Sequence, residues 1–191
     1  ESPTELLVVA HACADQARPE ARAYIQRLGT FVPTEARALE ARLLYREEKR
    51  DAAVETLVQV FLGLRNAPWV HPRAVQQALD LALLMGRADP AHARALFGAL
   101  AEPFALHQRD EVRRKIALGL TRCMPPEDGL QRAAAVFGTF EPHVPWNRNL
   151  LTYREKVYRL TENPRHAQAL EDLRAFRASE PPPFLEGNGG E

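Results

Sequence analysis

The sequence predicts an all-α protein, built as an α-solenoid of about five stacked helical hairpins. Apolar residues recur at i, i+3, i+4 and i+7 through most of the chain, whereas the alternating pattern of a strand is almost absent. Arg, Ala, Leu and Glu dominate the composition, which favours helix over strand. A proline followed by a large aromatic residue recurs about every 38 residues, a period typical of helical-hairpin repeats; these pairs are Pro68-Trp69, Pro103-Phe104, Pro145-Trp146 and Pro183-Phe184.

We expect residues 1–178 to form one helical-repeat domain, which the proline–aromatic pairs divide into hairpins. Its expected hairpins cover residues 1–29, 34–66, 71–102, 105–140 and 147–178, and a Pro-, Gly- and Glu-rich tail follows at 179–191. The tail is expected to be disordered beyond Leu185. We expect each proline to end a hairpin and each aromatic ring to fill the seam with the next hairpin. Trp69 and Trp146 are therefore expected in seams, with a role as ligand-stacking aromatics as the alternative.

The first two hairpins carry clear helix signals. Ser2-Pro3-Thr4-Glu5 is a capping box with proline at the first helical position. Gly29 is the expected C-cap of the helix that starts at Pro19. The polar run 47–51 forms the turn of the second hairpin, and its last residue, Asp51, is the expected N-cap of the helix that follows.

The later hairpins are marked in the same way. Pro72 begins a helix that Gly86 is expected to stop, and Asp89 caps the next helix. A long helix is expected over residues 106–123. Asn163 is expected to cap the last helix of the array.

Charge and hydropathy exclude two classes of partner. Lys+Arg and Asp+Glu both total 25, so the net charge is zero, and a nucleic-acid partner is not expected. The most apolar run, Leu6 to Ala14, is shorter than the roughly 20 residues that span a bilayer, so direct membrane insertion is not expected. The chain begins at Glu1, which suggests a domain of a longer protein. We expect a soluble, cytoplasmic domain. If it is tethered to a membrane, we expect the tether to lie elsewhere in the parent chain.

Motifs for chemistry are missing from the sequence. Cys13 and Cys123 are expected to be two free thiols, with a disulfide as the alternative. The six histidines lack the spacing of a zinc site, and no phosphate-, nucleotide- or hydrolase-type motif occurs. We therefore expect no catalytic residue, no metal and no cofactor.

The second hairpin resembles a tetratricopeptide repeat. Leu44-Tyr45, a polar turn and then the run 51–55, Asp-Ala-Ala-Val-Glu, look like the segment that joins the two helices of that repeat. Ala41 and Ala53 stand at its small-residue positions. The resemblance implies that the first helix of each hairpin lines a concave groove for extended or helical peptides.

A second resemblance covers about residues 34–184. The chain is similar there to the helical C-terminal region of membrane-anchored spermidine-synthase-like proteins. The resemblance is carried by Leu39 to Leu57, Pro68-Trp69, Ala78 to Ala82, Glu102 to Ala105, Glu141 to Trp146 and Asp172 to Phe184. It implies that a partner segment lies in another domain of the parent chain. It transfers no catalysis, because the glycine-rich cofactor loop and the acidic catalytic segment are absent.

Several side chains are candidates for partner binding, with a solvated helix face as the alternative. Arginine forks bind carboxylates in bidentate fashion, and an arginine on a first helix would face the groove. The candidates are Arg42, Arg46, Arg113, Arg114 and Tyr153.

The sequence therefore predicts a non-catalytic helical-repeat scaffold or protein-interaction domain. Its expected partner is an acidic or amphipathic protein or peptide segment, in another protein or in the parent chain. A small-molecule sensor or an enzyme on an α-superhelical scaffold is the alternative.

Overall fold

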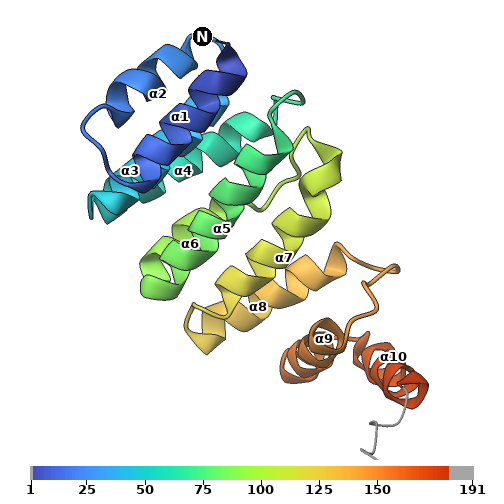
Figure 1. Ribbon diagram of the computed structural model, residues 1–191. Coiled ribbons are helices and arrows are strands. Elements are labelled where there is room, and N and C mark those ends of the chain that lie inside the picture. The colour runs from blue at the N-terminus through green and yellow to red at the C-terminus, as the bar shows by residue number, and fades with distance from the viewer. Residues whose placement is uncertain (1, 181–191) are drawn as a thin grey trace, which may run out of the picture. The chain divides into compact units, whose positions relative to one another are not determined.

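The computed structural model describes residues 2–180, and this part of the chain is entirely helical (Figure 1). It contains ten α-helices, one 3₁₀ turn and no strand, which confirms the predicted all-α class. The helices are α1 (Pro3–Asp15), α2 (Ala21–Gly29), α3 (Pro33–Arg46), α4 (Arg50–Leu64), α5 (Pro72–Ala88), α6 (Pro90–Ala99), α7 (Asp110–Thr121), α8 (Pro126–Gly138), α9 (Arg148–Leu160) and α10 (His166–Ser179).

Two of the predicted caps are present. The Ser2 hydroxyl accepts a hydrogen bond from the Glu5 N–H at 3.3 Å, and the Glu5 carboxylate accepts one from the Ser2 N–H at 2.7 Å. This reciprocal pair is the capping box that opens α1. The Asp89 carboxylate accepts a hydrogen bond from the Ala91 N–H at 2.7 Å and opens α6.

Three other helix starts differ from the prediction. Asp51 does not cap α4, because that helix begins one residue earlier, at Arg50. Its carboxylate instead lies 2.8 Å from Nε2 of His92 on α6. Residues 107–109 form the 3₁₀ turn, so the long helix expected over 106–123 is shortened to α7. Asn163 accepts a hydrogen bond from the Arg165 N–H at 2.9 Å, but it lies three residues before His166, the first residue of α10, and is not the N-cap of that helix.

Three hairpin turns share one backbone geometry. Each places a non-glycine residue in the left-handed region, and each is closed by a backbone hydrogen bond that returns five residues along the chain. These residues are Ala17 (φ 49°), Glu48 (φ 63°) and Glu162 (φ 52°). The closing bonds run from the Arg18, Lys49 and Asn163 N–H groups to the Cys13, Leu44 and Tyr158 carbonyls, at 2.9, 2.9 and 2.8 Å. This is the Schellman arrangement, which satisfies carbonyls at a helix C-terminus.

The chain divides into two compact units, with the boundary between Gly129 and Leu130 inside α8. In the first unit, α1 packs on α2, α3 on α4 and α5 on α6. The first helices of these pairs also contact one another in sequence, α1 with α3, α3 with α5 and α5 with α7, while α4 packs on α6 (Figure 1). The expectation of a single array through residue 178 stays a prediction.

Gly86 does not end α5, which continues to Ala88. A Cβ atom at Gly86 would overlap Cδ2 of Leu120 on α7 and lie 3.4 Å from Cα of Ala93 on α6. The relation is reciprocal, since a Cβ atom at Gly119 of α7 would lie 2.8 Å from Cδ1 of Leu83 on α5. Glycine is therefore needed at Gly86 for close helix packing rather than for helix termination.

The proline–aromatic pairs do not share one role. Phe104 is 1% exposed and stacks on Phe61 of α4, with ring centroids 5.9 Å apart. The next residue, Ala105, donates a backbone hydrogen bond to the Leu64 carbonyl at 2.9 Å and so ties this segment to the end of α4. Phe104 is therefore buried against α4 of the second expected hairpin, and its predicted place in the seam with the next hairpin stays a prediction.

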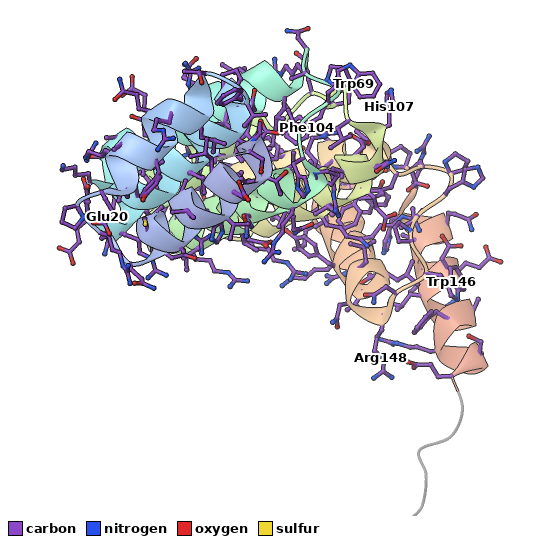
Figure 2. All side chains as sticks on the ribbon, turned by 45° about the horizontal axis from the view of Figure 1, so that its top comes forward. Glu20, Trp69, Phe104, His107, Trp146 and Arg148 are labelled. Atoms are coloured by element: carbon purple, nitrogen blue, oxygen red, sulfur yellow. The ribbon has the colours of Figure 1, made fainter. Side chains whose placement is uncertain are left out.

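The two tryptophans are not seam residues, so that prediction is wrong. Trp69 is 94% exposed and Trp146 is 55% exposed. Figure 2 shows Trp69 projecting from the edge of the first unit, whereas Phe104 lies among the helices. In the second unit, Trp146 makes an edge-on ring contact with Phe176 of α10, at 5.9 Å. The fourth pair, Pro183-Phe184, lies outside the described residues.

The two cysteines are free thiols, as expected. Cys13 is buried in the core of α1, α2 and α3. Cys123 is half-buried, and its burial raises the pKa of the thiol despite the opposing charge of Arg87. The alternative of a disulfide is excluded for this conformation.

Gly86→Ala should destabilise the chain by about 1–3 kcal/mol, because the overlap with Leu120 exceeds the gain in helix propensity. Gly98→Ala on α6 is the matched control, since no atom lies within 4 Å of a Cβ there. That control should stabilise the chain by about 0.5–1 kcal/mol. Urea unfolding measures both, and equal stabilities for the two variants would contradict the close α5–α7 contact.

Phe104→Ala should cost about 3–5 kcal/mol of unfolding free energy, the usual loss for a buried aromatic ring. Trp69→Ala should change it by no more than about 0.5 kcal/mol, because that ring is exposed. Trp146→Ala should cost about 1 kcal/mol, the value of one aromatic contact. Thermal and urea unfolding of the three variants provide the comparison, and a large loss for Trp69→Ala would argue against its exposed position.

Candidate functional site

The same face of three helices lines one groove in the first unit. Each helix contributes residues at i, i+3, i+4 and i+7, which extend along two turns, or about 10.5 Å. The residues are Thr4, Leu7, Val8 and His11 of α1, Glu35, Ala38, Leu39 and Arg42 of α3, and Ala74, Gln77, Ala78 and Leu81 of α5, with His71 and Arg73 beside them. We call this surface the α1–α3–α5 groove; it encloses a cavity of about 260 Å³.

The floor of the groove is apolar. Leu39, Ala78 and Leu81 are buried, whereas Val8 on the rim is 65% exposed. Small side chains at Ala38 and Ala74 leave room above this floor. The groove can therefore accept an aliphatic or aromatic side chain from a partner.

One end of the groove carries an ion-paired cluster. Arg42 Nε donates to one carboxylate oxygen of Asp15, and Nδ1 of His11 lies 3.2 Å from the other. Because a carboxylate only accepts, a neutral His11 carries its hydrogen on Nδ1. Its Nε2 atom is buried and has no hydrogen-bond partner among residues 2–180.

The other end carries a cation that faces solvent. Glu35 is 5% exposed, and its carboxylate accepts a hydrogen bond from the His71 N–H at 2.9 Å. Arg73 is exposed, and within the described part of the chain it has no ion-pair partner. The carboxylates near the groove are thus already engaged, and an incoming anion meets Arg73.

Of the five candidate binding residues, only Arg42 lines this groove. Arg46 is exposed one turn further along α3. Arg114 is half-buried, and its guanidinium lies 3.0 Å from the Asp110 carboxylate. These positions leave Arg42 as the sequence candidate that the structure places beside His11.

Arg113 is buried, so it does not contribute to a surface cationic patch. Its guanidinium bonds Asp110 at 2.8 Å and donates to the Leu100 carbonyl at the end of α6. Arg65 of α4 donates to the neighbouring Ala99 carbonyl at 3.1 Å. Carbonyls at a helix C-terminus lack partners within the helix, and these two arginines supply them.

Tyr153 lies in the second unit and is half-buried. Its ring makes an edge contact with Phe137 of α8, at 5.5 Å between centroids. Phe137 is fully buried and also meets Tyr158 of α9 at 6.0 Å. Tyr153 therefore packs against the aromatic core of this unit.

The second unit also contains a buried charged cluster around Arg154, which is 1% exposed. Its guanidinium lies 2.7 Å from Glu141 in the loop before α9 and 2.5 Å from Asp172 of α10. The Tyr158 hydroxyl donates to Glu141 at 3.1 Å. Burial acts to lower the pKa of Arg154, but the hydrogen bonds with Asp172 and Glu141 outweigh it and raise the pKa. The cluster joins loop, α9 and α10, and its groups already bind one another.

Sequence reasoning missed His11, Glu35 and Arg73 as groove residues. The stripe itself would have identified His11 and Glu35, because Thr4 to His11 and Glu35 to Arg42 repeat the same spacing on successive first helices, whereas Arg73 lies outside the stripe. Among residues 2–180, no three His, Cys, Asp or Glu side chains cluster in a way that would hold a metal ion. No helix in this part of the chain combines the length and apolar character needed to cross a bilayer.

The free energy of unfolding should fall as the pH rises above about 10, where tyrosine ionises in an unfolded chain. Burial, and then the Glu141 charge, raise the pKa of Tyr158 in the folded state. A raised pKa gives stability that is present below the unfolded value and is lost as pH rises through the folded one. The slope should reach about 1.4 kcal/mol per pH unit for this group. Urea unfolding from pH 9 to 11 should show a shallower decline for Tyr158→Phe, and identical slopes would contradict this assignment.

Comparisons with protein-family models, with curated proteins and with solved structures found no match to this chain. The resemblances to tetratricopeptide repeats and to spermidine-synthase-like proteins therefore stay predictions.

Proposed function

We propose that this chain is a non-catalytic helical-repeat domain that binds a protein segment along the α1–α3–α5 groove. Its hairpins are proposed to form a tetratricopeptide-like solenoid. The observation that carries the proposal is the identical i, i+3, i+4, i+7 stripe on three first helices, all of which line one surface. Stacked hairpins provide extended binding surfaces of this kind.

The repeated turns give independent support. Ala17 and Glu48 close the first two hairpins with the same left-handed geometry, and Glu162 closes the last helix pair likewise. Two of the three hairpins that line the groove therefore share one turn geometry. A repeating unit with a repeating lining is the arrangement expected of a peptide-binding array.

The lining favours an acidic, amphipathic segment. Its apolar floor takes a large aliphatic or aromatic side chain, and the exposed Arg73 pairs with a carboxylate. The resemblance to spermidine-synthase-like proteins suggests that the segment belongs to another domain of the parent chain.

A small-molecule ligand is the second candidate, because the deepest part of the groove encloses about 260 Å³. That volume is just below the range of roughly 300–1,000 Å³ usual for small-molecule sites. The stripe along two turns of three helices favours the longer peptide.

Ala38→Phe should fill the groove and weaken peptide binding at least about tenfold, because the new ring occupies the space of the partner's anchor residue. Random dodecapeptides displayed on phage would be selected against the full chain, and the enriched peptides resynthesised for fluorescence anisotropy. Ala95→Phe, on the exposed face of α6, is the matched control and should bind normally. The proposed function would be contradicted if the selection yields no peptide whose binding is lost in Ala38→Phe.

The charge of the partner has its own test. Arg73→Glu should weaken the selected peptides at least about tenfold, because it replaces attraction by repulsion. Arg46→Glu carries the same charge change outside the groove and should have little effect. Affinity should also decrease with added salt, since exposed charges are screened. Peptides whose binding is lost in Ala38→Phe but is unaffected by Arg73→Glu would support the groove as the binding site and would contradict an acidic partner.

A further inference from the structure

Trp69 is the most exposed large hydrophobic side chain of the described residues, at 94%. It lies in the connection between α4 and α5, next to Pro68, and projects from the same edge of the first unit as His107 (Figure 2). A tryptophan ring with this exposure buries little apolar surface in the core. Such residues are enriched among the anchors of protein interfaces.

A second cavity, of about 480 Å³, opens beside this ring. It lies where α1, α3 and α5 begin, and it adjoins the α1–α3–α5 groove. Its apolar walls include Pro3, Val32, Pro68, Val70 and Leu106. We call it the Trp69 cavity.

The rim of this cavity is stiff. Pro3 and Pro72 stand at the first positions of α1 and α5, and Pro68 precedes Trp69. Proline fixes one backbone dihedral, so less ordering is needed when a ligand binds. The Trp69 cavity is therefore largely formed before a partner arrives.

The polar groups of the Trp69 cavity suit backbone carbonyls rather than charged side chains. Within the described lining, Glu35 is the one residue ionised at neutral pH, and its carboxylate already accepts from the His71 N–H. Nδ1 of His71 accepts a hydrogen bond from the Arg73 N–H at 3.3 Å, so a neutral ring has its hydrogen on Nε2. The Gln108 amide and the Trp69 indole N–H are further donors.

These features match the polyproline II conformation. A polyproline II segment has no internal hydrogen bonds, so all of its carbonyls are free to accept. Its proline rings are uncharged and pack on aromatic faces in apolar grooves. A charged peptide would gain little from this lining, in contrast to the α1–α3–α5 groove.

We infer that the Trp69 cavity is a docking site for a proline-rich segment of another protein, next to the groove of the proposed function, with which it shares Thr4, Leu7, Glu35 and His71. Proline rings of the segment pack against the Trp69 ring, and its carbonyls accept hydrogen bonds from the Trp69 indole, Gln108 and His71. The site needs no metal, cofactor or covalent step. It gives the domain a second specificity on the same edge of the first unit.

The test uses an acetylated, amidated peptide, Gly-Pro-Pro-Pro-Phe-Leu-Gly, whose core has the composition of residues 181–185 of this chain. The chain contains two tryptophans, so Trp146→Phe leaves Trp69 as the only indole reporter. Titration should give a saturable blue shift of its fluorescence. The same peptide with its three prolines replaced by alanine should bind at least about tenfold more weakly.

Three variants locate the site, with anisotropy of a fluorescein-labelled peptide as the readout. Trp69→Ala should weaken binding at least about tenfold, whereas Trp146→Ala should leave it unchanged. Ala38→Phe should also leave it unchanged, so loss of groove binding and loss of proline-rich binding are distinguishable. Absence of a saturable shift, equal binding of the alanine peptide, insensitivity to Trp69→Ala, or loss of binding in Ala38→Phe would each overturn the inference.

Discussion

The packing of the first unit depends on the close approach of α5 to α7. Leu120 occupies the space above Gly86, and Leu83 occupies the space above Gly119, so each helix provides both a side chain and a gap. Helices of this length cannot bury an apolar face alone, and their stability comes mostly from neighbours. The paired glycines bring the backbones close enough for leucine methyl groups to fill the contact, at the cost of some helix propensity.

Arginine side chains donate hydrogen bonds to backbone carbonyls that the helix packing leaves without donors. The end of α6 lies against α4 and α7, where its last carbonyls would otherwise lack donors. Arg65 and Arg113 supply those donors from the two neighbouring helices. In the second unit, Arg154 has the corresponding role for a loop and two helices. Buried arginines in this chain therefore act as connectors between elements, which leaves exposed ones such as Arg73 for ligands.

Helical periodicity and proline positions were sufficient to predict the fold class and the approximate location of the helices. They were not sufficient for Gly86, because the same residue serves as a helix stop or as a packing gap, and the choice depends on Leu120, distant in the sequence. Nor did the polar turn reveal that Glu48 takes a left-handed conformation, since glycine is the usual residue there. Local signals placed the elements, and long-range contacts decided the roles of single residues.

The candidate site shows the same difference between local signals and long-range contacts. Arg42 was identified because its helix was expected to line a groove, and it does line one. Arg113 was grouped with Arg114 on charge alone, although the roughly 100° of helix rotation between neighbouring residues separates a buried side chain from a half-buried one. Arg73 was missed because its importance comes from the lack of a partner within the described residues, which only three-dimensional structure reveals.

The difference between Phe104 and Trp69 links packing to function. Both follow a proline at the end of a hairpin, so the local sequence assigns them one role. The Ala105–Leu64 backbone hydrogen bond draws the Phe104 segment onto α4, where the ring stacks on Phe61. Trp69 remains outside, beside a cavity walled by proline and aliphatic side chains. An aromatic ring that the fold leaves uncovered beside a preformed apolar cavity has its main energetic value in an interface, because only a partner can remove it from water.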